Sequence, residues 1–325
     1  MTPRQLWRSG TVTGIGSLPG KEASEACRFV LDELPIPHLP ELPDRGWHAD
    51  LGGRGAALLS DLYVDLQPSG WRLVPRSSRD GQRARDLLAR DVDALEQAGS
   101  STPPAVLKLQ ATGPWTLASI LELHRGNKVL SDHGAMSDLA QSLAQGLKDH
   151  VADVQRRLPS TTIVLQLDEP SLPAVLAARV RTASGWGTFR APDRQVARDR
   201  LGTVLEAAEH TVIHCCASDP PLALMGLAGA VSFDASLPYD EEVLGELLEQ
   251  GRGLLLGVVS GTDAELPTVK KVVEKVRRLR DRVGLTEVTL TPACGLAGAT
   301  EGYVRAALKR LLGAATAVEE DQSGG

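Results

Sequence analysis

The sequence predicts a single (β/α)8 TIM barrel, in which eight parallel strands alternate with helices. Short apolar runs rich in β-branched residues recur eight times, and helical patterns separate most of them. Eight such units favour closure into a barrel. An open doubly wound sheet is the rival, but neither a G-x-G-x-x-G turn after the first strand nor a P-loop is present. No linker interrupts the pattern, so we expect one domain over residues 1–315.

The expected elements follow from the local patterns in chain order. The expected strands cover residues 11–18, 37–44, 105–110, 161–167, 211–213, 230–234, 253–259 and 288–291. The expected helices cover residues 21–34, 50–62, 78–98, 133–158, 192–210, 240–250, 266–282 and 300–312, with short helices from 115 and over 222–228. Residues 63–74 are expected to be an extended excursion. The tail at 316–325 has no packing pattern and is expected to be disordered.

Composition and charge limit the possible classes of function. Apolar residues make up 42% of the chain and charged residues 23%, which is ordinary for a globular protein. The net charge is −6, and the Lys and Arg residues are scattered, which argues against a nucleic-acid-binding surface. No apolar run could cross a bilayer, and the first ten residues lack the core of a signal peptide. We therefore expect a cytoplasmic protein whose four cysteines stay reduced.

The fifth expected strand ends in the motif with the strongest chemical signal, T-V-I-H-C-C-A-S. Because strand side chains alternate, His214 and Cys216 lie on one face and Cys215 on the other. An imidazole and a thiolate this close favour zinc, although two buried small residues would give the same pattern. Cys294 lies just after the eighth expected strand and offers a third ligand, which favours the metal interpretation.

Other polar residues also follow the expected strands. They are Ser17, Glu41, Thr112, Asp168, Glu169 and Asp234. In a β/α barrel the carboxyl ends of the strands form one rim, and that rim carries the active site. The predicted fold therefore brings these residues together with the His and Cys residues.

Six short motifs occur in order along the chain. They are I-G-S at 15–17, T-G-P-x-T at 112–116, Q-x-D-E-P at 166–170, H-x-C at 214–216, S-x-[ED]-A at 232–235 and C-G-L at 294–296. Together they resemble the C-terminal catalytic barrel of cobalamin-independent methionine synthase, in a short single-barrel form. The resemblance implies a zinc enzyme that transfers a methyl group to homocysteine and forms methionine.

The same resemblance implies a set of metal ligands. It places zinc on His214, Cys216, Cys294 and an acidic residue, which is Asp234 here and Glu in most relatives. Asp can bind zinc through oxygen. The alternative for Asp234 is a hydrogen bond within its own loop or at a helix start.

The resemblance also implies an amino-acid pocket made of Ile15, Gly16, Ser17 and Asp168, with Glu41 assigned by order alone. In this assignment the carboxylates hold the α-amino group, and the turn holds the α-carboxylate. Asp168 could instead cap the helix that begins near Pro170.

The methyl donor is the least determined part of the site. Trp115 is a candidate for stacking on a planar donor, with core packing as the alternative. Thr112 is a further substrate-binding candidate, with a plain turn as the alternative. The resemblance predicts a His after the seventh strand that protonates the leaving nitrogen of 5-methyltetrahydrofolate, but Thr262 stands there. Asp263 is the remaining candidate acid. A methylcorrinoid protein as donor would not need this proton, so both donors stay open.

Three other functions compete with methionine formation. One is a methyltransferase of the wider uroporphyrinogen-decarboxylase-like superfamily with another thiol or donor. A second is a non-catalytic barrel that binds a metal or a thiol amino acid. A zinc hydrolase is the third, and it is disfavoured because thiolate-rich ligation suits activation of a thiol better than activation of water.

Overall fold

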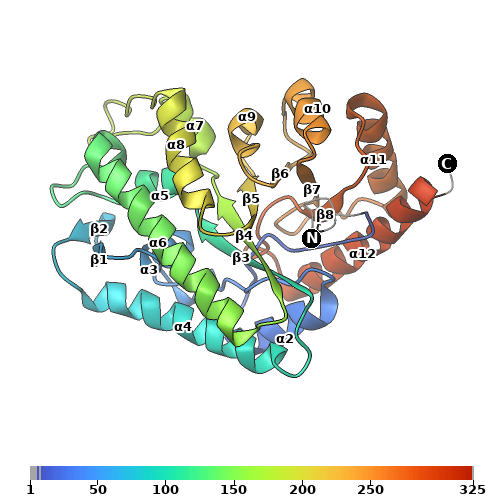
Figure 1. Ribbon diagram of the computed structural model, residues 1–325, viewed down its shortest axis with the longest axis horizontal. Coiled ribbons are helices and arrows are strands. Elements are labelled where there is room, and N and C mark those ends of the chain that lie inside the picture. Colours follow the sequence, from blue (N-terminus) through green and yellow to red (C-terminus); the bar gives the residue numbers. More distant parts are fainter. Residues whose placement is uncertain (1–5, 7–8, 324–325) are drawn as a thin grey trace.

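A parallel sheet of six strands is the framework of the molecule, as seen in a computed structural model that describes residues 6 and 9–323. The strands are hydrogen-bonded in the order β3-β4-β5-β6-β7-β8, so that each is parallel to the next. Their bounds are β3 Val106–Thr112, β4 Thr162–Asp168, β5 His210–Cys215, β6 Ala230–Asp234, β7 Gly253–Val259 and β8 Thr289–Pro292. The sheet curves into a half-barrel (Figure 1). Six of the expected strands are therefore confirmed.

Helices surround the sheet on its outer side (Figure 1). The α-helices are α2 Ala23–Glu33, α3 Leu51–Ala57, α4 Arg79–Gly99, α5 Pro114–Ile120, α6 His133–Arg157, α7 Leu172–Leu176, α8 Arg194–Leu205, α9 Leu222–Met225, α10 Glu241–Glu249, α11 Val269–Val283 and α12 Glu301–Ser323. Two 3-10 turns are η1 Pro43–Arg45 and η2 Val129–Ser131. Among these described helices, none is both long enough and apolar enough to pass through a lipid bilayer.

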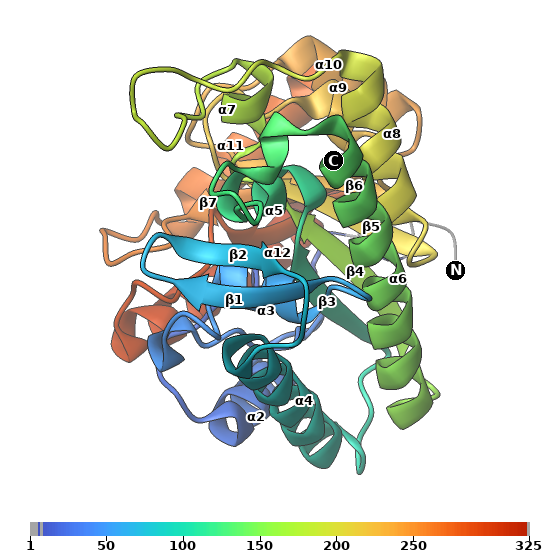
Figure 2. The same ribbon diagram turned by 90° about the vertical axis from the view of Figure 1, so that its left-hand side faces the viewer.

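The excursion expected at residues 63–74 is an antiparallel hairpin of β1 Tyr63–Gln67 and β2 Gly70–Val74. Figure 2 shows it outside the parallel sheet, between α5 and α4. Trp71 from this hairpin is buried, and its indole N–H donates to the carbonyl of Trp47. The hairpin therefore packs as part of the domain.

Two of the eight expected strands, at 11–18 and 37–44, are not regular strands. Each makes only isolated parallel bridges, which join Val12 to Leu290, Ser17 to Glu41, and His38 to Lys108. These bridges connect β8 to the first segment, the first segment to the second, and the second to β3. The second segment carries three prolines, which cannot donate to a ladder. The prediction of eight regular strands was wrong at these two positions.

The C-terminal residues also differ from the prediction. Helix α12 continues through residues 316–323, for which disorder was expected. Val318 is buried against the core, and Asp321 accepts a 2.8 Å hydrogen bond from Arg280 of α11. These contacts stabilise the last turns of the helix. Residues 324–325 lie outside the described part of the chain, and the domain bounds 1–315 stay a prediction.

The inner face of the sheet changes from apolar to polar along the strands. Its apolar layer consists of Leu6, Ile36, Val164, Val212, Ala230 and Leu255. Residues two positions further along a strand share the same face, and there the buried side chains are Lys108, Gln166, His214 and Ser232. The opposite face of β3 and β4 carries only apolar residues such as Leu107 and Leu165, which pack under the helices. The polar interior lies toward the carboxyl ends of the strands.

Close packing of α6 against residues 58–60 gives a stability prediction. A Cβ on Gly146 would lie 1.6 Å from the carbonyl oxygen of Leu58. We expect Gly146→Ala to lower the free energy of unfolding by about 1–3 kcal/mol, because α6 must move away. Gly202 in α8 has open space around it, so Gly202→Ala should instead raise it by about 0.5–1 kcal/mol. Urea unfolding measures both, and equal effects of the two variants would contradict this account.

Candidate metal and amino-acid site

Three potential metal ligands meet at the carboxyl end of the sheet. His214 lies on β5, Cys216 directly follows β5, and Cys294 follows β8. One ligand atom from each lies within 4.8 Å of the others. The two sulfur atoms are 3.0 Å apart and share a hydrogen bond. Cys215 is buried on the other side of the strand, as alternation predicts.

The imidazole of His214 is oriented for a ligand. Its Nδ1 shares a 2.9 Å hydrogen bond with the hydroxyl of Ser232 on β6. Its Nε2 is buried and has no hydrogen-bond partner among the described residues. An unpaired buried nitrogen costs about 1–3 kcal/mol, and a metal-binding His is commonly anchored through its other nitrogen. One imidazole and two thiols fit a zinc site in which a coordination position stays open.

The electrostatics of the two thiols favour one shared negative charge. The pKa of Cys294 is lowered, first by its hydrogen bond with Cys216 and then by the nearby His214. The pKa of Cys216 is raised, chiefly because of the same hydrogen bond and because of burial. The pair therefore releases its first proton easily and its second with difficulty. A bound cation would offset the repulsion between two thiolates.

The fourth predicted ligand, Asp234, lies outside this group of three. Its Oδ1 accepts 2.8 Å and 2.7 Å hydrogen bonds from the backbone N–H and hydroxyl of Ser236. It lines a cavity of about 610 Å³ together with Cys216 and Cys294. The structure thus brings three of the four predicted ligands together and places Asp234 nearby, bonded within its own loop.

The turn at residues 15–17 lies directly beside residues 293–296, the loop after β8 that carries Cys294 and is called the cysteine loop below. A Cβ on Gly295 would lie 2.0 Å from the hydroxyl of Ser17, and Leu296 N–H donates to the Ser17 carbonyl over 2.8 Å. The backbone N–H of Glu41 donates to the carbonyl of Gly16 over 3.1 Å. The predicted amino-acid pocket is therefore next to the sulfur atoms, although its residues are far apart in sequence.

Asp168 ends β4 and is buried beside this turn. Its Oδ1 accepts a 2.7 Å hydrogen bond from Nε2 of Gln166. Burial and the neighbouring Glu41 raise the pKa of Asp168 well above its usual range. The helix after Pro170 has no side-chain cap, so Asp168 does not serve as one.

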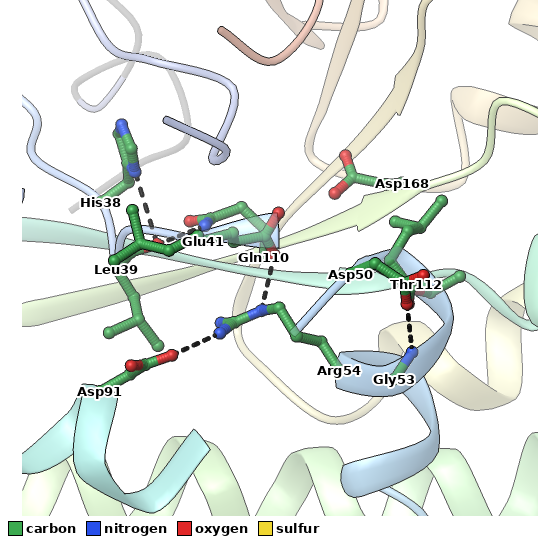
Figure 3. A network of polar contacts seen from close by, with 12 residues as sticks. His38, Leu39, Glu41, Asp50, Gly53, Arg54, Asp91, Gln110, Thr112 and Asp168 are labelled. Atoms are coloured by element: carbon green, nitrogen blue, oxygen red, sulfur yellow. Dashed lines mark hydrogen bonds and ion pairs between the residues drawn. The ribbon is translucent and has the colours of Figure 1, made fainter. Parts of the chain in front are cut away.

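An ion-pair network with residues of α3 and α4 holds the carboxylate of Glu41 (Figure 3). Arg54 of α3 donates to Glu41 over 3.1 Å and to Asp91 of α4 over 2.9 Å. Arg45 makes two 2.7 Å hydrogen bonds to the same Asp91. In Figure 3 the Glu41 carboxylate lies between Arg54 and Asp168. This network leaves no local signal in the sequence, because Arg54 and Asp91 belong to ordinary helical patterns.

Lys108 is a second functional candidate that was not predicted from the sequence. Its side chain is fully buried on the inner face of β3, and burial lowers its pKa to about 7, although Asp168 and Glu41 oppose that shift. The sequence carries one sign of this position: Lys108 lies between two leucines in an expected strand, and side chains in a strand alternate between its two faces.

Glu169, next to Asp168, has a different task. Its carboxylate accepts hydrogen bonds from the backbone N–H groups of Trp115 and Thr116 at 2.9 Å and 2.8 Å, and from the Thr116 hydroxyl at 2.7 Å. A Cβ on Gly113 would lie 2.4 Å from this carboxylate. Burial raises the pKa of Glu169 to about 7. The T-G-P-x-T and D-E-P motifs thus meet to cap the start of α5.

Three predicted site residues are used in packing or capping contacts. The hydroxyl of Thr112 donates to the Leu51 carbonyl over 2.5 Å. Trp115 is 3% exposed, and its indole N–H donates to Ala197 of α8 over 3.2 Å, which leaves no open ring face for a planar donor. Asp263 accepts hydrogen bonds from the backbone and hydroxyl of Thr300, at the start of α12.

The family model described as "Cobalamin-independent synthase, Catalytic domain" matches residues 82–317, which is well over half of the chain. The chain belongs to this family. Membership supports methyl transfer as the class of reaction. The match includes the three ligand residues and Asp168, whereas residues 15–17 and Glu41 lie before it.

Two further similarities differ in weight. The fold is similar to a solved B12-independent methionine synthase from Shewanella sp. W3-18-1 in complex with selenomethionine, with a TM-score of 0.67 over 98% of this chain and 100% of that chain. At 13% identity this likeness shows the fold alone. A phosphomevalonate kinase from Streptomyces sp. (strain CL190) is 28% identical over 79% of this chain and 75% of its own. We give the family model more weight, because it matches residues 82–317, which include the clustered His214, Cys216 and Cys294.

The cluster gives a prediction for metal content. We expect about one zinc ion per chain in the wild type. Cys294→Ser should lose most of this zinc, because the substitution removes one of three ligands. Elemental analysis after gel filtration measures this, with circular dichroism to confirm folding.

Asp234→Asn is the matched control for that variant. It should keep its zinc, because the carboxylate is bonded to Ser236 and lies outside the ligand group. Equal zinc loss in both variants would contradict the three-residue site.

Proposed function

We propose that this protein is a zinc-dependent methyltransferase that moves a methyl group to the thiol of homocysteine and forms methionine. The observation that carries the proposal is the position of His214, Cys216 and Cys294 next to the buried carboxylates of Glu41 and Asp168. A free thiol has a pKa of about 8.5 and is mostly protonated at neutral pH. Zinc bound at this site would lower the pKa of the substrate thiol.

The two buried carboxylates are suited to the α-ammonium group of the amino acid. Asp168 is raised in pKa by burial and by Glu41, so a cation between the two would stabilise both charges. Arg54 keeps Glu41 in place from the other side. The backbone turn at residues 15–17 would hold the α-carboxylate. This arrangement points the substrate sulfur toward the cysteine loop, because Ser17 packs against Gly295.

The methyl donor would enter through the cavity beside Cys216 and Cys294. There the residues of this chain hold acceptor and donor in line, which removes much of the entropic cost of the encounter. Thr262 lines the same cavity, and Asp263 is engaged by Thr300. Neither is a ready acid for an amine leaving group. Family membership favours 5-methyltetrahydrofolate, so we propose it as the donor. A methylcorrinoid, which needs no such acid, is the donor to test beside it.

The proposal is tested by methionine formation in the zinc-loaded protein. Homocysteine is supplied with 5-methyltetrahydrofolate or with a methylcorrinoid, and methionine is measured by mass spectrometry. Asp168→Asn should lower kcat/KM about 10- to 100-fold, because a hydrogen bond to a charged group is lost.

Asp149→Asn, on the exposed side of α6, is the matched control and should leave kcat/KM within about twofold of the wild type. Methionine from neither donor would sink the proposal. If the protein methylates a different thiol but not homocysteine, the proposed substrate would be wrong and the proposed reaction class would stand.

A further inference from the structure

Lys108 is a buried cation whose direct partners are neutral groups. Among residues 6 and 9–323, no carboxylate lies within 4.0 Å of its ammonium group, whereas the buried Arg54 has two such partners. Lys108 Nζ donates 2.7 Å hydrogen bonds to the carbonyl of Ile15 and to Oε1 of Gln166. It therefore connects the N-terminal segment to β3 and β4 in the interior of the sheet.

This contact determines which way the Gln166 amide points. An ammonium group has only donors, so it requires the oxygen of the amide. The nitrogen of Gln166 must then face away from Lys108, and it donates to Asp168 Oδ1 over 2.7 Å and to the Ile15 carbonyl over 3.0 Å. A reversed amide would set its NH2 group against the ammonium and its oxygen against a carboxylate.

The fixed amide leaves one oxygen of Asp168 for a ligand. Oδ1 is taken by Gln166, and Oδ2 has no donor within the described part of the chain. The turn at residues 15–17 is also held by Glu41 and Leu296, so it does not depend on Lys108 alone. Loss of Lys108 should therefore disturb Asp168 more than the turn.

We propose that Lys108 and Gln166 are a positioning pair that aims the free oxygen of Asp168 at the α-ammonium group of the substrate. This inference rests on the proposed function. Neither residue contacts the reacting atoms. Their effect is selectivity for a thiol that carries an amino group over one that does not.

The test compares two ligands that differ only in that group, L-homocysteine and 4-sulfanylbutanoate. Calorimetric titration of the zinc-loaded protein gives the Kd of each. Lys108→Met should raise the Kd of homocysteine by about tenfold or more, because a charge-assisted contact is misaligned. The Kd of 4-sulfanylbutanoate should change by less than about threefold. A merely structural role would weaken both ligands alike.

Two further variants keep the test decisive. Gln166→Glu retains an acceptor for Lys108 but loses the donor to Asp168, so it should show the same selective loss even if Lys108→Met does not fold. Lys128→Met is the matched control, because Lys128 also donates a 2.7 Å hydrogen bond to a carbonyl, that of Ile120, away from the site. It should leave both Kd values unchanged.

The outcomes separate this inference from the function on which it rests. Unchanged homocysteine binding in Lys108→Met and Gln166→Glu, or equal weakening of both ligands, would overturn the positioning pair alone. A wild-type protein that binds neither ligand would overturn the proposed function and this inference with it.

Discussion

The burial of one lysine inside the sheet constrains much of the surrounding structure. A buried ammonium group is strongly unfavourable unless it is hydrogen-bonded. Lys108 meets this requirement with the Ile15 carbonyl and the Gln166 amide, which belong to two other segments. The segments at residues 11–18 and 37–44 lie between β8 and β3, where they make single bridges in place of a ladder. The same contact orients Gln166 and so Asp168.

The site depends on two supports that lie on opposite sides of it. From inside the sheet, Ser232 anchors His214 and Gln166 anchors Asp168. From the helical layer, Arg54 anchors Glu41 and is itself anchored by Asp91. His214, Asp168 and Glu41 thus each have one polar contact that fixes the side chain and one atom left available. Such preorganisation lowers the cost of binding, because few side chains must be ordered when the ligand arrives.

Neighbouring residues in one motif have separate tasks in this family member. Asp168 faces the interior and the cysteine loop, whereas Glu169 faces outward and caps α5 through Trp115 and Thr116. Strand alternation explains the division, because successive side chains point to opposite faces. This cap also requires a glycine at position 113, because a side chain there would collide with Glu169. A motif that reads as one functional unit therefore combines a chemical residue with a structural cap.

The sequence by itself determined the parallel α/β architecture, six of the strands, and the joint position of His214, Cys216 and Cys294, because alternation and strand ends are local properties. Only the tertiary structure decided the rest. Residues 11–18 and 37–44 make only single bridges, and the second of these segments carries three prolines. Contacts with α11 extended α12 to Ser323. Trp115 and Asp263 went to packing and capping because their partners, Ala197 and Thr300, are distant in sequence. The Lys108 and Arg54 networks depend on long-range contacts, which no local pattern encodes.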